Sequence, residues 1–232
     1  NATTGAVTAT ITAGIASDLN TALANATAAD ALKLTVNGET ANATVLNALD
    51  GKTSVTVNAA AIKNIDGAGA TGAAAVKAAY DANALKTISG LGNETVDLSG
   101  ATDANASLVK AINDYTTGVI TLKTLETTAG NFSLSQLGDL KGITGLDTID
   151  TTGVNTNMTI SLKDLLAAND STNSFDFTIL GDASDSITFT DTTTTGWTLT
   201  AGGTTLAGNS TYINDVTSQV IEITHTNIVI NA

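Results

Sequence analysis

The chain has 232 residues, enough for one large domain or two small ones, and 42% of them are hydrophobic although only 3% are aromatic. Its core must therefore consist mainly of Ala, Val, Ile and Leu. The net charge is −13, every basic residue is a lysine, and no apolar run reaches the length of a membrane helix. These features exclude nucleic-acid binding and membrane insertion from the expected functions, because phosphate binding needs clustered cations.

Short β-branched stretches alternate with apolar residues at helical spacing through residues 1–168. The expected strands are residues 7–11, 32–36, 54–57, 94–98 and 119–122. The expected helices carry the apolar sets Ile15, Leu19 and Leu23; Val45, Leu46 and Leu49; Val76, Ala79 and Tyr80; and Leu108, Val109 and Ile112. Ser161 precedes Asp164 by three residues, which is typical of the start of a further helix.

Residues 34–57 and 96–122 resemble each other in the order of their apolar, glycine and polar positions. Equivalent positions include Val36 and Leu98, Asn42 and Asn105, and Leu49 and Ile112. A related stretch lies between them, so the elementary unit is a strand, a turn and a short helix of about 30 residues. Stacked units of this kind predict a solenoid-like domain of short parallel strands backed by short helices. An ordinary compact α/β domain is the alternative.

The pattern changes near residue 168. No lysine follows Lys163, and the polar stretch "NDSTNS" at residues 169–174 is typical of a linker. Beyond it, apolar and polar residues alternate in about six short runs separated by Gly, Asp and Asn. We therefore expect a mixed, β-rich protein of two domains, with α/β solenoid-like repeats at residues 1–168 and an antiparallel β-sandwich-like module at residues 169–232.

The last module contains, in order, "LGDASDSITF", "GWTLT", "TYIND", "VIEIT" and "NIVIN". This order of a G-D-x-x-D turn, a G-W strand, a Tyr strand and two closing strands resembles the C-terminal β-modules of bacterial S-layer and RTX-like surface repeat proteins exported by type I secretion. The Ala/Thr-rich repeats upstream are similar to the arrays of such proteins. The resemblance implies a secreted cell-surface protein. The family's calcium repeat, G-G-x-G-x-D-x-U-x, is absent in intact form.

Three aspartates in this module form the candidate metal site. Asp182, Asp185 and Asp191 could coordinate calcium, which binds six to eight oxygen ligands. The alternative is an acidic turn whose carboxylates accept local backbone hydrogen bonds. Calcium is the one cofactor that the sequence suggests.

No catalytic constellation accompanies these acids. His225, the only histidine, is in phase with Ile221 and Ile223, which predicts an inward histidine with its hydrogen bonds satisfied, or one at a sheet edge. Zinc and a Ser-His-Asp triad both need more partners than the sequence offers. The glycine-rich stretch at residues 67–72 lacks the P-loop lysine and predicts a flexible turn. We therefore expect no enzymatic activity.

The acidic, cysteine-free composition rich in Thr, Asn and Gly favours an extracellular location, and a cytosolic protein is the opposite interpretation. The expected function is a structural protein that assembles with copies of itself into a surface layer, sheath or fibre. The apolar terminal stretch "NIVINA" suits pairing with a neighbouring sheet. The alternative is a calcium-dependent adhesin module that binds a surface glycan or lipopolysaccharide.

Overall fold

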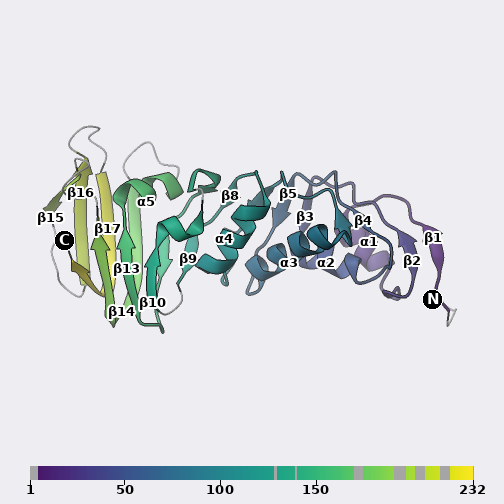
Figure 1. Cartoon of the computed structure of the whole chain (residues 1–232), viewed down its shortest axis with the longest axis horizontal. Helices are drawn as coiled ribbons and strands as arrows, with labels where there is room; N and C mark the ends of the chain where they lie inside the picture. The colour runs from purple at the N-terminus through teal and green to yellow at the C-terminus, as the bar shows by residue number, and fades with distance from the viewer. Residues whose placement is uncertain are drawn as a thin grey trace. The chain divides into compact units, whose positions relative to one another are not determined.

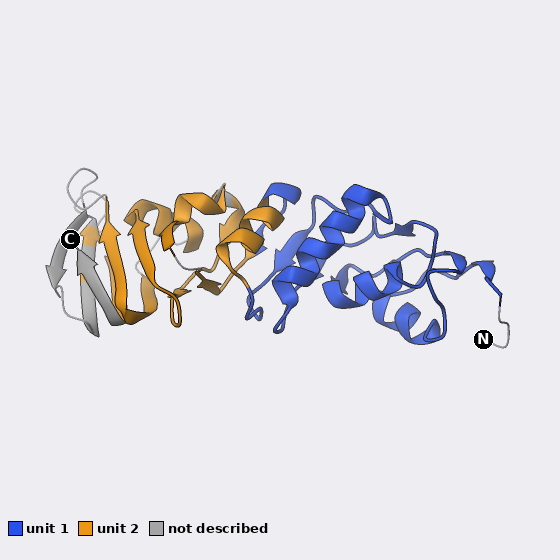
Figure 2. Cartoon of the chain, turned by 60° about the horizontal axis from the view of Figure 1, so that its bottom comes forward, with its two compact units in different colours: residues 1–103, 114–120 blue, residues 104–113, 121–232 orange. Residues whose placement is uncertain are grey.

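The structure is a computed structural model that describes residues 5–127, 130–138, 140–169, 175–190, 197–201, 207–214 and 220–231. These residues form a mixed α/β fold with parallel sheets, as the sequence predicts (Figure 1). The chain divides into two compact units (Figure 2). Unit 1 contains residues 1–103 and 114–120, and unit 2 contains residues 104–113 and 121–232.

Unit 1 alternates short strands with helices. Its helices are α1 (Ala16–Ala22), α2 (Ala43–Asp50) and α3 (Gly72–Leu85). Its strands are β1 (Thr8–Thr10), β2 (Ala31–Lys33), β3 (Thr40–Asn42), β4 (Val57–Asn58), β5 (Asn64–Asp66), β6 (Ile88–Ser89) and β7 (Thr95–Asp97), and β8 (Ile120–Thr121) follows at the unit boundary. Helix α4 (Ala106–Tyr115) lies mostly in unit 2. The strands confirm the short strands expected from the sequence.

Paired strands of unit 1 are parallel and come from successive passages of the chain. Thr8 of β1 lies opposite Ala31 of β2, which belongs to the next passage. In the ladder β3–β5–β7, Asn64 lies opposite both Thr40 of the passage before it and Thr95 of the passage after it. Helix α2 packs against both α1 and α3. Each passage of the chain therefore adds a strand to a parallel ladder. It also adds a helix that packs against the helix of the previous passage.

The predicted helix faces are largely buried. Leu46 and Leu49 of α2, and Val76 of α3, are inaccessible to solvent. Ile15 is the main exception at 45% exposure, because it lies just before α1 at the end of the array. The core is aliphatic, as the composition requires.

The sequence repeat is visible in polar contacts. The Asn42 side chain accepts hydrogen bonds from the backbone at the start of α2, and Asn105 accepts one from Leu108 N at the start of α4. The buried Thr53 hydroxyl donates to Leu32 O, and Thr116, its counterpart in the later copy, donates to Glu94 O. The equivalence that the sequence predicts is therefore structural and not merely compositional.

Unit 2 contains longer strands. They are β9 (Thr124–Glu126), β10 (Gly130–Ser133), β11 (Ile143–Thr144), β12 (Thr148–Asp150), β13 (Thr156–Ile160), β14 (Phe175–Phe189), β15 (Trp197–Ala201), β16 (Ala207–Asn214) and β17 (Val220–Asn231). Two 3-10 helices, η1 (Leu134–Leu137) and η2 (Leu140–Gly142), and helix α5 (Leu162–Asn169) connect them. The expected cap of α5 is present, since Asp164 N donates to Ser161 Oγ.

One eight-stranded sheet holds most of these strands, in the order β10–β13–β14–β17–β16–β15, with β12 joined to β14 and β9. β14 is parallel to β12, β13 and β17, and only β15, β16 and β17 pair antiparallel. The described residues therefore do not show the antiparallel β-sandwich expected for residues 169–232. The reason lies in "LGDASDS": the sequence suggested a turn there, but it is an irregular part of the single strand β14, with a register shift between Leu180 and Asp185.

The same sheet joins strands on both sides of residue 168, because β12 and β13 pair with β14. The boundary between the two compact units falls earlier in the chain. The division into domains at residues 1–168 and 169–232 stays a prediction.

Helix α3 ends on a strained residue, which gives a first testable prediction. Lys86 has φ 67°, the only positive φ among the described non-glycine residues. Lys86→Gly is expected to raise the free energy of unfolding by about 1 kcal/mol, because glycine adopts this left-handed cap without a Cβ clash. Urea titration followed by circular dichroism measures the gain. Lys86→Ala keeps the Cβ and should bring none; an equal gain from alanine would contradict the backbone explanation.

Candidate functional site

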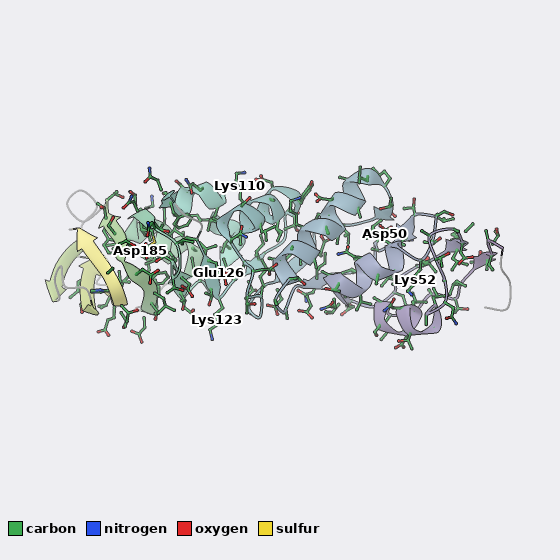
Figure 3. All side chains as sticks on the ribbon, turned by 90° about the horizontal axis from the view of Figure 1, so that it is seen from below. Asp50, Lys52, Lys110, Lys123, Glu126 and Asp185 are labelled. Carbon is green, nitrogen blue, oxygen red and sulfur yellow. The ribbon has the colours of Figure 1, made fainter. Side chains whose placement is uncertain are left out.

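The carboxylate of Asp185 lies in the interior of unit 2, where it is labelled in Figure 3. It is 1% exposed, at the irregular part of β14. Its Oδ1 accepts Thr156 N at 2.8 Å, and its Oδ2 accepts Asp182 N and Thr151 Oγ1, each at 2.7 Å. Two of these donors come from the preceding strand-and-turn passage, so Asp185 joins that passage to β14. A charge buried in this way is stabilised by the donors of the chain itself.

The other predicted calcium ligands are arranged differently. Asp182 is half-buried, and its Oδ2 accepts Gly153 N at 2.6 Å. Asp191 lies outside the described residues. Within the described ranges, no cluster of three or more His, Cys, Asp or Glu side chains is placed to hold a metal ion. The acidic-turn alternative expected local backbone hydrogen bonds, but only the bond from Asp182 N is local and the other donors lie 29 and 34 residues away; calcium binding stays a prediction.

Two further acids in unit 1 have a similar environment. Asp30 is 4% exposed and accepts Val7 N and Thr27 N at 2.8 and 2.9 Å. These backbone donors, Thr27 first, lower the pKa of the Asp30 carboxyl. Glu94 is 2% exposed and accepts Gly92 N and Asn93 N. Neither acid was predicted from the sequence. Their only signal is that each lies just before one of the two copies of the repeat, at residues 34–57 and 96–122.

The glycine-rich stretch at residues 67–72 is a tight turn and not a flexible one. A Cβ on Gly72 would overlap the carbonyl oxygen of Gly67, so the two backbones are in direct contact. The turn leads into α3, whose first N–H groups, from Ala73 and Ala74, donate to the Asp103 carboxylate at 2.8 and 2.9 Å. The position where a phosphate would sit at a helix N-terminus is thus taken by the chain's own carboxylate.

His225 points inward, as predicted, but its hydrogen bonds are not satisfied. It is 1% exposed on β17, and neither ring nitrogen has a hydrogen-bond partner. Across the register it lies opposite Ile179 of β14 and Gly208 of β16, which offer no side-chain acceptor. Burial lowers the pKa of this imidazole below 6.5.

The first strand of unit 1 has an open edge. Among the described residues β1 pairs with β2 alone. Val7 O accepts Ala31 N, and Ile11 N donates to Lys33 O. Because alternate residues of a strand face opposite neighbours, the backbone groups of Thr8 and Thr10 face away from β2.

An apolar hollow of about 210 Å³ adjoins this edge. Its lining includes Val7, Ala9, Ile11, Leu23 and Leu32. Asp30 is the one ionisable lining residue, and it is occupied by Val7 N and Thr27 N. A second hollow, of about 390 Å³, lies where β3 ends its own ladder and is lined in part by Ile15 and Val45. Unit 1 thus offers unpaired strand edges next to largely apolar surface, which includes Asp30 in the first hollow and the exposed Glu39, paired with Lys63, in the second.

Comparison with known proteins finds no matching family model, no similar curated protein and no similar solved structure. The resemblance to bacterial S-layer and RTX-like surface proteins therefore stays a prediction. In the parts of the chain that the structure describes, no helix is both long enough and apolar enough to cross a membrane.

Proposed function

We propose that this chain is a non-enzymatic, extracellular structural protein that assembles with copies of itself through open strand edges. The observation that carries the proposal is that each unit contains a strand with an open edge among the described residues. In the described residues, β1 pairs only with β2, and β15 pairs only with β16. An unpaired edge is a template for a strand of another chain, and two different edges per chain are enough for an open polymer.

The strand registers support the solenoid-like part of this proposal. Neighbouring strands of unit 1 are parallel, and each pairs with a strand of the next passage of the chain. Units of this kind bury their apolar faces only against another unit, so a strand with a described partner on one side alone leaves apolar residues beside it uncovered. The hollow beside β1 has this composition.

The charge distribution favours a second copy as the partner. With a net charge of −13, copies of the chain repel each other over most of their surface. The strand β1 carries no charged residue, and Asp30, in the adjoining hollow, is held by backbone donors. Two copies can therefore approach at this edge without bringing free carboxylates together.

The terminal stretch "NIVINA", for which the sequence suggested pairing with a neighbouring sheet, is paired within the chain along one side. Ile228 to Asn231 pair with Asp185 to Thr188 of β14, so they already belong to the sheet of the same chain. Removing them would weaken unit 2 as well as any assembly. The edges of β1 and β15 are better sites for a test.

Thr10→Pro is the direct test of the β1 edge. Proline removes the Thr10 N–H, which faces away from β2, and is tolerated on an edge strand. We expect the variant to stay folded and the association constant, measured by sedimentation, to fall about fivefold for each interchain hydrogen bond lost, with fewer polymers in electron micrographs. Thr10→Ser keeps the N–H and is the matched control.

The results of these experiments distinguish a wrong interface from a wrong function. If purified protein forms no oligomers or polymers with or without calcium, self-assembly is wrong. If the polymers form but Thr10→Pro leaves them unchanged, self-assembly stands and the β1 edge is not its interface. Thr8→Lys with Thr10→Lys gives a second check, since added charges on an edge block pairing while keeping every N–H.

A further inference from the structure

β17 carries the one side chain of this protein whose ordinary pKa lies near neutrality. The chain has a single histidine and no cysteine. His225 is 1% exposed, and both of its ring nitrogens are buried without a hydrogen-bond partner. Buried polar groups normally have partners, so this exception calls for a physical account.

The surroundings of His225 favour its neutral form. Ile223 on the same strand and Ile179 across the register on β14 are both inaccessible to solvent. On β16 the residue opposite is Gly208. An imidazolium ion here would have lost its water without gaining an acceptor, which is costly in an apolar interior.

Among the described residues of β14, β16 and β17, no acid is placed to compensate for a charge on the ring. On β14, Asp176 is exposed, Asp182 binds Gly153 N, and Asp185 is held by three donors and lies opposite Ile228, beyond the register shift. On β17 itself, Glu222 is exposed. β16 contributes one titratable residue, Tyr212, which pairs with Ile221. Burial is accordingly the cause that lowers the pKa of His225.

The direction of the pH effect follows from this. In the unfolded chain the imidazole takes up a proton at its ordinary pKa of 6.5, whereas the folded chain resists protonation. Below about pH 6.5 the unfolded state therefore binds more protons, and acid favours opening. The stability is fully present above about pH 6.5 and is lost as the pH falls toward the folded pKa.

We propose that His225 is an acid switch in unit 2: protonation of its ring separates β17 from β14 and β16 and releases the C-terminal strands. The device depends on the interior of the sheet and would operate whether or not the chain assembles, but opening would also release β15, whose edge is proposed above for assembly. The strands β14, β17 and β16 would stay paired at neutral pH and would separate in mild acid.

The test is urea unfolding between about pH 7.5 and about pH 5.5, followed by the fluorescence of Trp197. Trp197 is the only tryptophan and lies on β15 of the same sheet. We expect the unfolding equilibrium constant to rise by up to about tenfold per pH unit below about pH 6.5, the limit for one proton. His225→Leu should remove this dependence.

A matched control moves the histidine to the outer face of the same strand. Thr224 is exposed, so Thr224→His combined with His225→Leu keeps one histidine in the chain and should also show no pH dependence. A dependence that persists in His225→Leu, or one absent from the unmodified protein, would overturn the proposal. Should His225→Leu not fold, an NMR titration of the single imidazole decides, since a midpoint at or above 6.5 in the folded protein is incompatible with the switch.

Discussion

Asp185→Ala is expected to lower the free energy of unfolding of unit 2 by about 3 kcal/mol, the largest effect of a side-chain truncation that we predict. The carboxylate is 1% exposed, and two of its donors belong to Thr151 and Thr156, which are 0% and 1% exposed. Without the carboxylate the buried Thr156 N–H loses its acceptor, whereas the Thr151 hydroxyl still has Leu180 O at 2.9 Å. Urea titration followed by Trp197 fluorescence measures the loss.

The neighbouring aspartate provides the control. Asp182 is half-buried and accepts one described hydrogen bond, from the exposed Gly153 N, so Asp182→Ala should lower the free energy of unfolding by less than about 1 kcal/mol. Both variants are compared in calcium and in EDTA. If the two carboxylates shared a calcium ion, both substitutions would be similarly damaging and chelation would lower the midpoint of the unmodified protein. Because the described hydrogen bonds hold the two carboxylates separately, we expect unequal losses in the two variants and no effect of chelation on the midpoint.

Gly72→Ala is expected to destabilise unit 1 by about 3 kcal/mol or to prevent its folding. The added Cβ would overlap the carbonyl of Gly67, whose N–H pairs with Asp97 O. Relieving the overlap would also displace the N-terminus of α3 from the Asp103 carboxylate that caps it. Circular dichroism of the helices during urea titration reports the effect.

Gly51→Ala is the matched control for this prediction. Gly51 has φ −68°, and a Cβ there would make only ordinary contacts, at 3.6 Å or more. Alanine should therefore be neutral or stabilising by about 0.5 kcal/mol. Equal losses in the two variants would show that the close contact between Gly67 and Gly72 is not what matters.

The sequence predicted the elements of unit 1 well because apolar periodicity reports burial directly. Residues 94–98 and 119–122 contain β7 and β8, and Val76, Ala79 and Tyr80 are buried on α3 as expected. The strands β3 and β5 were missed. Each has one inward apolar residue, Ala41 or Ile65, between polar ones, so a three-residue strand leaves almost no alternation to detect.

Unit 2 was harder to predict because its decisive contacts span long separations. Glycine and two aspartates in "LGDASDS" are typical of a turn, yet β14 continues through them. What permits this is Asp185 accepting hydrogen bonds from Thr151 and Thr156, 34 and 29 residues away. The sequence therefore identified an important carboxylate but not its partners, since donors at such distances leave no local pattern.

The recurrence of capping residues has a consequence for the length of the protein. Asn42 is followed by "ATVL" and Asn105 by "ASLV", and both asparagines cap the helix that begins at the next residue. Removing residues 43–105 would thus join a cap to a helix start of the same kind. Unequal recombination at such a joint could lengthen or shorten the chain in steps of about two elementary units, with a helix cap already in place at each new joint.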